Sequence, residues 1–380
     1  MSGPAFTVQG WCPGALRPMM SGDGLVVRLR PPGGRLTPTQ VDGIAAAARA
    51  FGNGMIELSA RANVQLRGIS EANHPALIDA LRDLGLTDPD PATEARRNMT
   101  VTPFADAVTD RLAAELALAL AHAPDLPGKF GFAVDTGPAP VLRGASADIR
   151  LERAADGGLL LRCDGAPFGA RVIEPEAAQA VLALAQWFVA AGGVQDARGR
   201  MAALIATGAG PTGALAPMVA PALAVQAPDP GLCPQGALLG FAFGQIGAET
   251  FAKMALLGAL RVTPWRMVLV EGLDSLPDLP GVLTRPDAPL RRVMACTGAP
   301  GCGQAFAPVR DLARRLAPQV PPGRVLHVSG CAKGCAHPAA ADVTLVATAR
   351  GFDLIRDGAA QARPDVFDLA AAQIDLKGLF

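Results

Sequence analysis

The sequence predicts an α+β protein that is internally duplicated. Residues 25–69 have the pattern of a strand, a helix and return strands, and residues 236–273 repeat this order in a similar length with little residue identity. Each copy is followed by short β-runs closed by glycine turns, over residues 130–165 and 341–358. Between the halves, residues 206–232 are rich in Gly, Pro and Ala, as in a connecting segment. Two related halves joined by a linker would form one pseudo-symmetric molecule with a cleft between them.

The first α+β unit begins with the alternating pattern LVVRLRP, which predicts a half-buried strand. Thr37 can cap a helix and Pro38 suits its first turn, so a helix is expected next. The stretch MIELSARANVQLRGI supplies the return strands, and a second helix is expected to begin at Ser70. The apolar face of that second helix would consist of Leu77, Leu81 and Leu84.

These patterns divide the chain into five segments. They are a first α+β unit over residues 1–88, a first β-rich module over 89–205, a linker over 206–232, a second α+β unit over 233–285 and a second module over 286–380. The second module holds the paired cysteines, and the first module has none of them.

The charge balance argues against nucleic acid or a membrane surface as the partner. The chain has 34 basic and 34 acidic residues, and half of its residues are hydrophobic. Proline interrupts the apolar stretches before they reach the length of a membrane span, and no basic leader with an apolar core opens the chain. We therefore expect a cytoplasmic protein whose partner is a small molecule.

Four of the seven cysteines stand in two glycine-rich pairs. Five residues separate Cys296 from Cys302, and three separate Cys331 from Cys335. A short amphipathic helix is expected between the pairs, which would bring the second pair back beside the first. Its apolar face would consist of Val309, Leu312, Ala313 and Leu316. The odd cysteine count argues against a disulfide framework, so a metal site is the better interpretation.

Four converging thiolates suit either zinc or an iron–sulfur cluster. The five-residue gap is loose for structural zinc, whereas a cluster is wider and accepts it. Glycines around both pairs would let backbone N–H groups point at sulfur. We favour a cluster, with zinc or no metal as the alternatives. The remaining cysteines, Cys12, Cys163 and Cys233, are expected to be small buried hydrophobic residues, and a role for Cys12 is left open.

A row of polar residues is expected on one strand of the first unit. Its members are Arg61, Asn63, Gln65 and Arg67. Alternate strand residues share a face, and a polar face in a compact protein needs a bound partner or a cleft. Arg28 and Arg30 alternate in the same way on the earlier strand, where a solvated face is an equally good interpretation.

These residues together resemble the nitrite and sulfite reductase superfamily, which uses siroheme and an iron–sulfur cluster. The Cys-x5-Cys and Cys-x3-Cys loops are similar to its cluster signature. SARANVQLRGI is similar to its Thr-x-Arg-x-x-x-Gln strand, RRNMTVTP to its Arg-Asn-x4-Pro stretch and LPGKFGFAV to its Leu-Pro-x-Lys-Phe-Lys segment. The resemblance covers nearly the whole chain. It implies two ferredoxin-like half-domains and two repeats of a cluster or tetrapyrrole module.

The resemblance also implies the site residues. A [4Fe–4S] cluster would be bound by Cys296, Cys302, Cys331 and Cys335, and arginines would pair with the carboxylates of a tetrapyrrole. The expected tetrapyrrole-binding residues are Arg17, Arg61, Asn63, Gln65, Arg67, Arg97 and Asn98.

Lys129 and Arg61 are the expected catalytic residues, since a cation could stabilise negative charge that develops on oxygen. His327 and His337 flank the second cysteine pair, so an additional non-heme iron is a further option.

Two departures from the reductases bear on activity. Gly131 stands where they carry a second lysine, and Lys333 stands where they usually carry asparagine. The opening WCPGALRPMMSGDG is instead similar to the branch of the superfamily that acts in aerobic cobalamin (vitamin B12) biosynthesis. That branch implies a monooxygenase that takes dioxygen and electrons from an external donor. It would hydroxylate precorrin-3A at C20 while a lactone closes.

Two alternatives stay open at this point. One is a siroheme-dependent sulfite or nitrite reductase, in which Cys335 would bridge the cluster and the siroheme iron. The other is a non-catalytic iron–sulfur or zinc protein, which would leave the polar strand unexplained.

Overall fold

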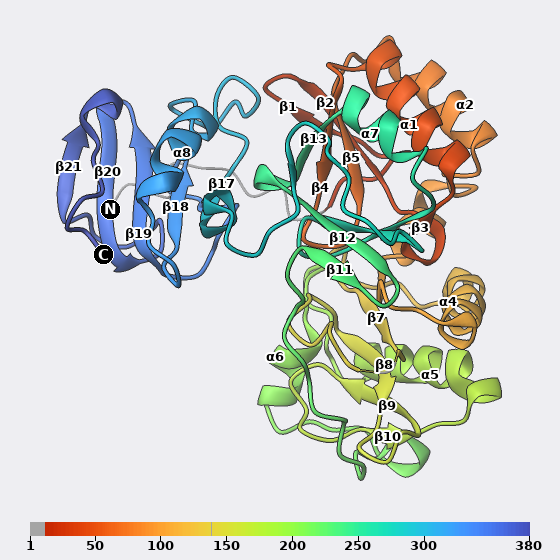
Figure 1. Ribbon diagram of the computed structural model, residues 1–380. Helices are drawn as coiled ribbons and strands as arrows, with labels where there is room; N and C mark the ends of the chain where they lie inside the picture. The colour runs from red at the N-terminus through yellow and green to blue at the C-terminus, as the bar shows by residue number, and fades with distance from the viewer. Residues whose placement is uncertain (1–11, 138) are drawn as a thin grey trace.

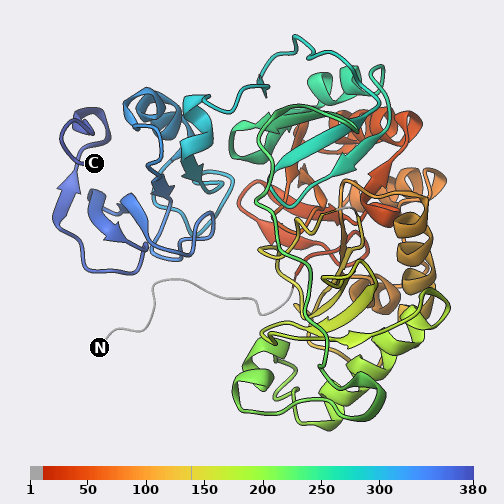
Figure 2. The same ribbon diagram turned by 60° about the horizontal axis from the view of Figure 1, so that its bottom comes forward.

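The computed structural model describes residues 12–137 and 139–380 and shows three bodies (Figure 1). Two ferredoxin-like half-domains form a central core, the first module lies beneath it, and the second module lies to one side. Figure 2 also shows the second module at one side of the core. The opening stretch through Trp11, on which the sequence predicts no leader, lies outside the described residues. Within the described part of the chain, no helix has the length and apolar character needed to cross a membrane.

The two half-domains share the order of three strands, a helix and two strands, after which the first continues with a helix and the second with a strand. The first contains β1 (Met19–Ser21), β2 (Gly24–Leu29), β3 (Arg35–Leu36), α1 (Pro38–Phe51), β4 (Met55–Leu58), β5 (Val64–Ile69) and α2 (His74–Asp83). The second contains β11 (Gly231–Cys233), β12 (Gly236–Phe241), β13 (Gln245–Gly247), α7 (Ala248–Met254), β14 (Leu260–Val262), β15 (Met267–Glu271) and β16 (Val282–Leu283). The duplication predicted from the sequence is therefore present in the fold.

The first helix, α1, begins where the sequence predicts. The Thr37 side chain accepts from the backbone N–H of Gln40, and the Gln40 side chain accepts in return from the backbone N–H of Thr37, which forms a capping box ahead of Pro38. The predicted start of α2 at Ser70 is wrong, because the helix begins at His74. Ser70 closes a turn before the helix, and Pro75 has no N–H with which to extend the helical ladder backwards.

Each half-domain completes the sheet of the other. The strand orders are β1-β2-β5-β4-β13 and β11-β12-β15-β14-β3, so β13 of the second half joins the first sheet and β3 of the first half joins the second. Ile246 lies opposite Ile56, and Leu36 lies opposite Leu260. All four of these side chains are buried in one hydrophobic cluster that spans both halves. The half-domains therefore share a single core.

The hairpin turns of the two halves match atom for atom. Between β4 and β5, the hydroxyl of Ser59 accepts from the backbone N–H groups of Arg61 and Asn63. Between β14 and β15, the hydroxyl of Thr263 accepts from the N–H groups of residues 265 and 267 in the same way. Each turn contains one residue with positive φ, 52° at Ala62 and 59° at Arg266. This correspondence relates Arg266 to Ala62.

The two modules also share one topology. The first contains β6 (Met99–Val101), α4 (Ala107–Ala119), β7 (Phe132–Asp135), β8 (Ile149–Arg153), β9 (Leu159–Cys163) and β10 (Ala170–Arg171). The second contains β17 (Val293–Ala295), α8 (Arg310–Leu316), β18 (Leu326–Ser329), β19 (Ala341–Thr348), β20 (Gly351–Gly358) and β21 (Val366–Leu369). In each sheet the first three strands are parallel and the last two antiparallel. In the first module α3 (Pro91–Arg96) precedes β6, and α5 (Ala177–Ala190) and α6 (Met201–Ala206) follow β10.

The segment after α6 runs along the first module. Val219 forms a bridge with Gly169, and Pro221 forms one with Ala154. The backbone N–H of Val225 donates to the carbonyl of Pro140. This connection is therefore anchored to the module by main-chain hydrogen bonds before it enters the second half-domain.

Candidate functional site

The two cysteine loops leave the same edge of the second module's sheet. Cys296 directly follows β17, and Cys331 follows β18, which lies next to β17 in parallel register. Carboxyl ends of parallel strands meet at one edge of a sheet, so the loops converge there. Helix α8 forms the predicted return between them and buries the predicted apolar face. The backbone N–H of Gly330 donates to Sγ of Cys296 at 3.2 Å, which ties the two loops together.

The four thiols are within electrostatic reach of one another. Burial raises the pKa of the Cys331 thiol, and negative charge on Cys296 and Cys302 would raise this pKa further. Burial also raises the pKa of Cys335, and negative charge on the other three cysteines would raise it further. Among the described residues, however, no three His, Cys, Asp or Glu side chains lie close enough to ligate one metal ion.

The first cysteine loop is held against the first half-domain by Arg67. Its Nη2 donates to the carbonyl oxygen of Gly301 at 2.6 Å, within the Cys-x5-Cys segment. The hydroxyl of Ser21 donates to the same oxygen at 2.6 Å. A Cβ atom at Gly22 would lie 2.2 Å from the carbonyl oxygen of Pro300, so the tip of the β1–β2 hairpin fits against this loop only with glycine.

A buried carboxylate anchors the same interface. Glu57 on β4 is 6% exposed and pairs with Nη1 of Arg67 at 3.4 Å. It also pairs with Nη2 of Arg310, the first residue of α8, at 2.7 Å. Asp23 pairs with Arg67 at 2.7 Å. All three guanidinium nitrogens of Arg67 are thus engaged inside the protein.

A second group of predicted residues meets between the first half-domain and the first module. Nη2 of Arg61 donates to the carbonyl of Lys129 at 3.3 Å, and the Lys129 side chain is exposed. Nδ2 of Asn98 donates to the carbonyl of Phe130 at 2.7 Å. A Cβ atom at Gly131 would lie 3.0 Å from Nδ2 of Asn98 and 3.4 Å from Nη1 of Arg61. The structure therefore brings Arg61, Lys129, Asn98 and Gly131 together.

Gln65 adjoins this group through Arg28. Oε1 of Gln65 accepts from Nε and Nη2 of Arg28 at 3.0 and 2.7 Å. Burial lowers the pKa of Arg28, while the neighbouring Cys12 raises it and Arg61 lowers it. Asn63 is buried, and its Nδ2 has no partner. Arg28 is therefore a member of the polar group, although its sequence pattern alone left a solvated face equally open.

Arg97 has partners of its own outside these contacts. Arg97 forms a bidentate pair with Asp88 at 2.8 Å and donates to the carbonyl of Arg30. Arg30 is buried and pairs with Glu94 at 3.3 Å, so it does not lie on a solvated face. Arg17 is exposed. The charge of Arg97 is thus already balanced within the protein.

The histidines beside the second cysteine loop form a close pair. The ring centroids of His327 and His337 lie 5.8 Å apart. His327 is fully buried, and neither of its ring nitrogens has a partner in the structure. Burial, His337 and Arg266 lower the pKa of His327 to about 4. Within the described part of the chain, no further His, Cys, Asp or Glu completes a metal site with them.

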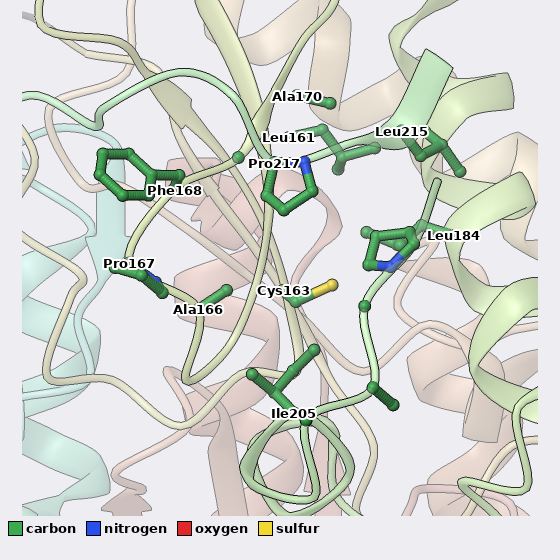
Figure 3. A pocket seen from close by; sticks show the side chains of 15 residues that line it. Leu161, Cys163, Ala166, Pro167, Phe168, Ala170, Leu184, Ile205, Leu215 and Pro217 are labelled. Atoms are coloured by element: carbon green, nitrogen blue, oxygen red, sulfur yellow. The ribbon is translucent and has the colours of Figure 1, made fainter. Parts of the chain in front are cut away.

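The other cysteines differ in their surroundings. Cys163 is buried, as predicted, and burial raises its pKa to about 12. Figure 3 shows its side chain in an apolar cavity of about 240 Å³ in the first module, with Leu161 and Ile205. Cys12 and Cys233 are only half-buried, which corrects the expectation that they are buried. Cys233 lies on the edge strand β11, and Cys12 lies beside Arg28.

The sequence did not indicate the roles of Asp23, Glu57 and Arg310. Each of them acts through a partner far away in the chain, and Arg310 lies 253 residues from Glu57. A glutamate within an alternating strand and an arginine at a helix start have no sequence pattern that would reveal this pairing.

Comparisons with known proteins agree with this architecture. Residues 17–84 match the model of the nitrite/sulfite reductase ferredoxin-like half domain. A precorrin-3B synthase from Sinorhizobium sp is 31% identical over 97% of this chain and 88% of its own length. The structure of the Mycobacterium tuberculosis NirA protein superposes with a TM-score of 0.62 at 20% identity, covering 87% of this chain and 74% of that chain. At that identity the NirA likeness concerns the fold.

Proposed function

Because the chain belongs to the precorrin-3B synthase family, we propose that it is a cytoplasmic monooxygenase of aerobic cobalamin biosynthesis. It would hydroxylate precorrin-3A at C20 with closure of a lactone. One atom of dioxygen would enter the product and the other would leave as water, with two electrons from an external donor and two protons from solvent. The observation that carries the proposal is the contact between Arg67, from the tetrapyrrole-binding motif, and the Cys-x5-Cys loop. This contact joins the two expected parts of one site.

The four paired cysteines fit a [4Fe–4S] cluster. The donor set is purely thiolate, the loops are rich in glycine, and a backbone N–H already donates to Cys296. Cys296, Cys302 and Cys331 all act on the pKa of Cys335, and the five-residue gap in the first loop favours a cluster over structural zinc. Such a cluster would supply electrons singly. His327 and His337 would need a further ligand to hold a second iron.

The macrocycle would bind where Arg61 and Asn98 contact the backbone of Lys129 and Phe130, with Gln65 joined through Arg28. Arg61 and Arg28 provide guanidinium groups for substrate carboxylates, and Arg61 already donates to the main chain at Lys129. The exposed ammonium of Lys129 would stabilise negative charge on oxygen. Arg67 and Arg97 would act indirectly, because their donors are engaged with Asp23, Glu57 and Asp88.

The structure gives a physical reason to disfavour the siroheme reductase alternative. Reduction of sulfite or nitrite would need a second cation near position 131. A lysine there would have to place its Cβ atom 3.0 Å from Asn98 and 3.4 Å from Arg61. The Asn98 side chain would have to shift to accommodate this Cβ atom, whereas the distance to Arg61 is that of an ordinary contact.

The test is an assay with labelled dioxygen. Protein purified without oxygen should contain iron and acid-labile sulfide but no stoichiometric siroheme. The reduced protein should convert precorrin-3A into a product that carries one labelled oxygen, as measured by mass spectrometry. A turned-over product without label, or tightly bound native siroheme, would favour the reductase alternative.

A further inference from the structure

A cavity of about 380 Å³ lies between the second half-domain and the second module. Ala336 and His337, directly after Cys335, form one wall. Trp265 and Arg266 from the β14–β15 turn form another. Ala60, next to Arg61, also reaches it. The cavity therefore extends from the second cysteine loop to the turn that carries the predicted catalytic arginine.

Arg266 is the unbalanced charge in this cavity. Its Nη2 donates to the carbonyl of Ala336 at 3.2 Å, and its Nη1 lies 3.9 Å from Sδ of Met294. No ion pair within the described ranges involves this half-buried residue. Arg291 also lines the cavity, but it pairs with Asp229 at 2.7 Å.

The groups around Arg266 do not compensate its charge. Glu57 is within electrostatic range, but it already pairs with Arg67 and Arg310. Arg310 is a like charge, and burial together with Arg310 lowers the pKa of Arg266. A guanidinium desolvated without a carboxylate is unfavourable unless a ligand provides one.

The backbone at Arg266 supports a role for the side chain. Its φ of 59° lies in the left-handed region, which is unfavourable for a residue with a long side chain. The equivalent residue of the first half-domain, Ala62, shows that the turn itself does not need an arginine. The guanidinium is held beside the second cysteine loop despite this strain.

We propose that this cavity is a carboxylate subsite, in which Arg266 binds one acidic side arm of the macrocyclic substrate. This inference rests on the proposed function and adds a binding residue from the second half-domain. The cavity is near the lower end of ligand-pocket volumes, about 300–1,000 Å³, and thus suits a side arm and the adjacent part of a ring. A planar guanidinium matches a carboxylate in a bidentate geometry.

The test measures binding of uroporphyrin, a stable porphyrin whose side arms all end in carboxylates, to the cluster-loaded protein. R266Q should raise the Kd about 10- to 100-fold, because a charge-assisted pair is lost. R266K should raise the Kd by a smaller factor, since lysine keeps the positive charge but lacks the planar guanidinium group. R285Q is the control, because Arg285 is an exposed arginine outside the cavity that pairs with Asp287, and its Kd should stay within about threefold of wild type.

Precorrin-3A turnover gives a second measurement, in which R266Q should raise KM more than it lowers kcat. Wild-type affinity in a folded R266Q protein would overturn the subsite while leaving the proposed function intact. If R266Q does not fold, R266M decides in the same way, because it keeps an unbranched apolar stem without the charge. A wild-type protein that binds neither uroporphyrin nor precorrin-3A would instead overturn the proposed function.

Discussion

Arg67 connects the first half-domain to the cysteine loops through one carbonyl oxygen. Its Nη2 contacts Gly301 between Cys296 and Cys302, while two carboxylates hold the rest of its guanidinium. The sequence predicts that Arg67 binds substrate. That role stays a prediction, and the donors of Arg67 hold the loop on which the cluster would depend.

An Arg67→Met substitution should therefore act on stability and on the cluster together. The substitution removes the arginine that pairs with Glu57 and Asp23 at a buried interface. The free energy of unfolding should therefore fall by about 3–5 kcal/mol. The reconstituted cluster should be lost faster to a chelator. The control is Arg49→Gln, which removes an exposed pair with Glu249 and should cost less than about 1 kcal/mol. A stable Arg67→Met protein with weaker macrocycle binding would restore the substrate-binding role.

Asp135 gives a stability prediction at the same scale. This buried aspartate has one carboxylate oxygen without a partner, and burial, with Glu152 across the ladder, raises its pKa to about 6. The unfolded chain loses this proton at lower pH than the folded protein, so folding stability falls as pH rises from about 4 to about 6.

Asp135→Asn removes this titration. Relative to wild type, the variant should gain about 2–3 kcal/mol in free energy of unfolding between pH 4 and pH 7.5. Urea unfolding at both pH values measures the difference. An equal effect of the substitution at both values would mean that Asp135 is charged in the folded protein without penalty.

At the scale of elements, short-range patterns predicted the structure well. The cap at Thr37 correctly predicted α1, and the apolar spacing that ends at Leu316 correctly predicted α8. Helix caps and apolar spacing depend only on residues a few positions apart, so the sequence shows them directly. The convergence of the cysteine loops could also be predicted from a return helix between them. The pairing of Arg67 with Gly301 could not, since 234 residues separate them and no local pattern encodes such a contact.

The cysteine loops provide the element-scale prediction. Cys302→Ser should abolish the iron and acid-labile sulfide of the reconstituted protein, because one of four ligands is replaced by a poorer donor. Cys163→Ser is the matched control, since Cys163 lies in the apolar cavity of the other module. Metal and sulfide analysis of both proteins decides the assignment. The assignment would be contradicted if the Cys163 variant lost its iron and sulfide while the Cys302 variant retained them.

At the scale of the whole molecule, the shared core makes the halves interdependent. Residues 12–205 alone would lack β13, which covers the edge of β4, and would expose β3 without its partner β14. An uncovered edge and half a core favour aggregation. We expect residues 1–205 to be insoluble when expressed alone, and co-expression with residues 206–380 to restore a soluble complex. Light scattering and co-purification measure this, and a monomeric, cooperatively folding first half would contradict it.

The strand exchange also constrains synthesis on the ribosome. Glu57 and its partner Gln245 are 188 residues apart, so the first sheet cannot close until most of the chain has been made. At about 5–20 residues per second, this interval lasts roughly 10–40 seconds. During that time the nascent first half presents an open strand edge to the cell. The protein should therefore depend on chaperones that bind nascent chains. Faster folding of the first half would not shorten this interval, because the interval is set by the rate of synthesis.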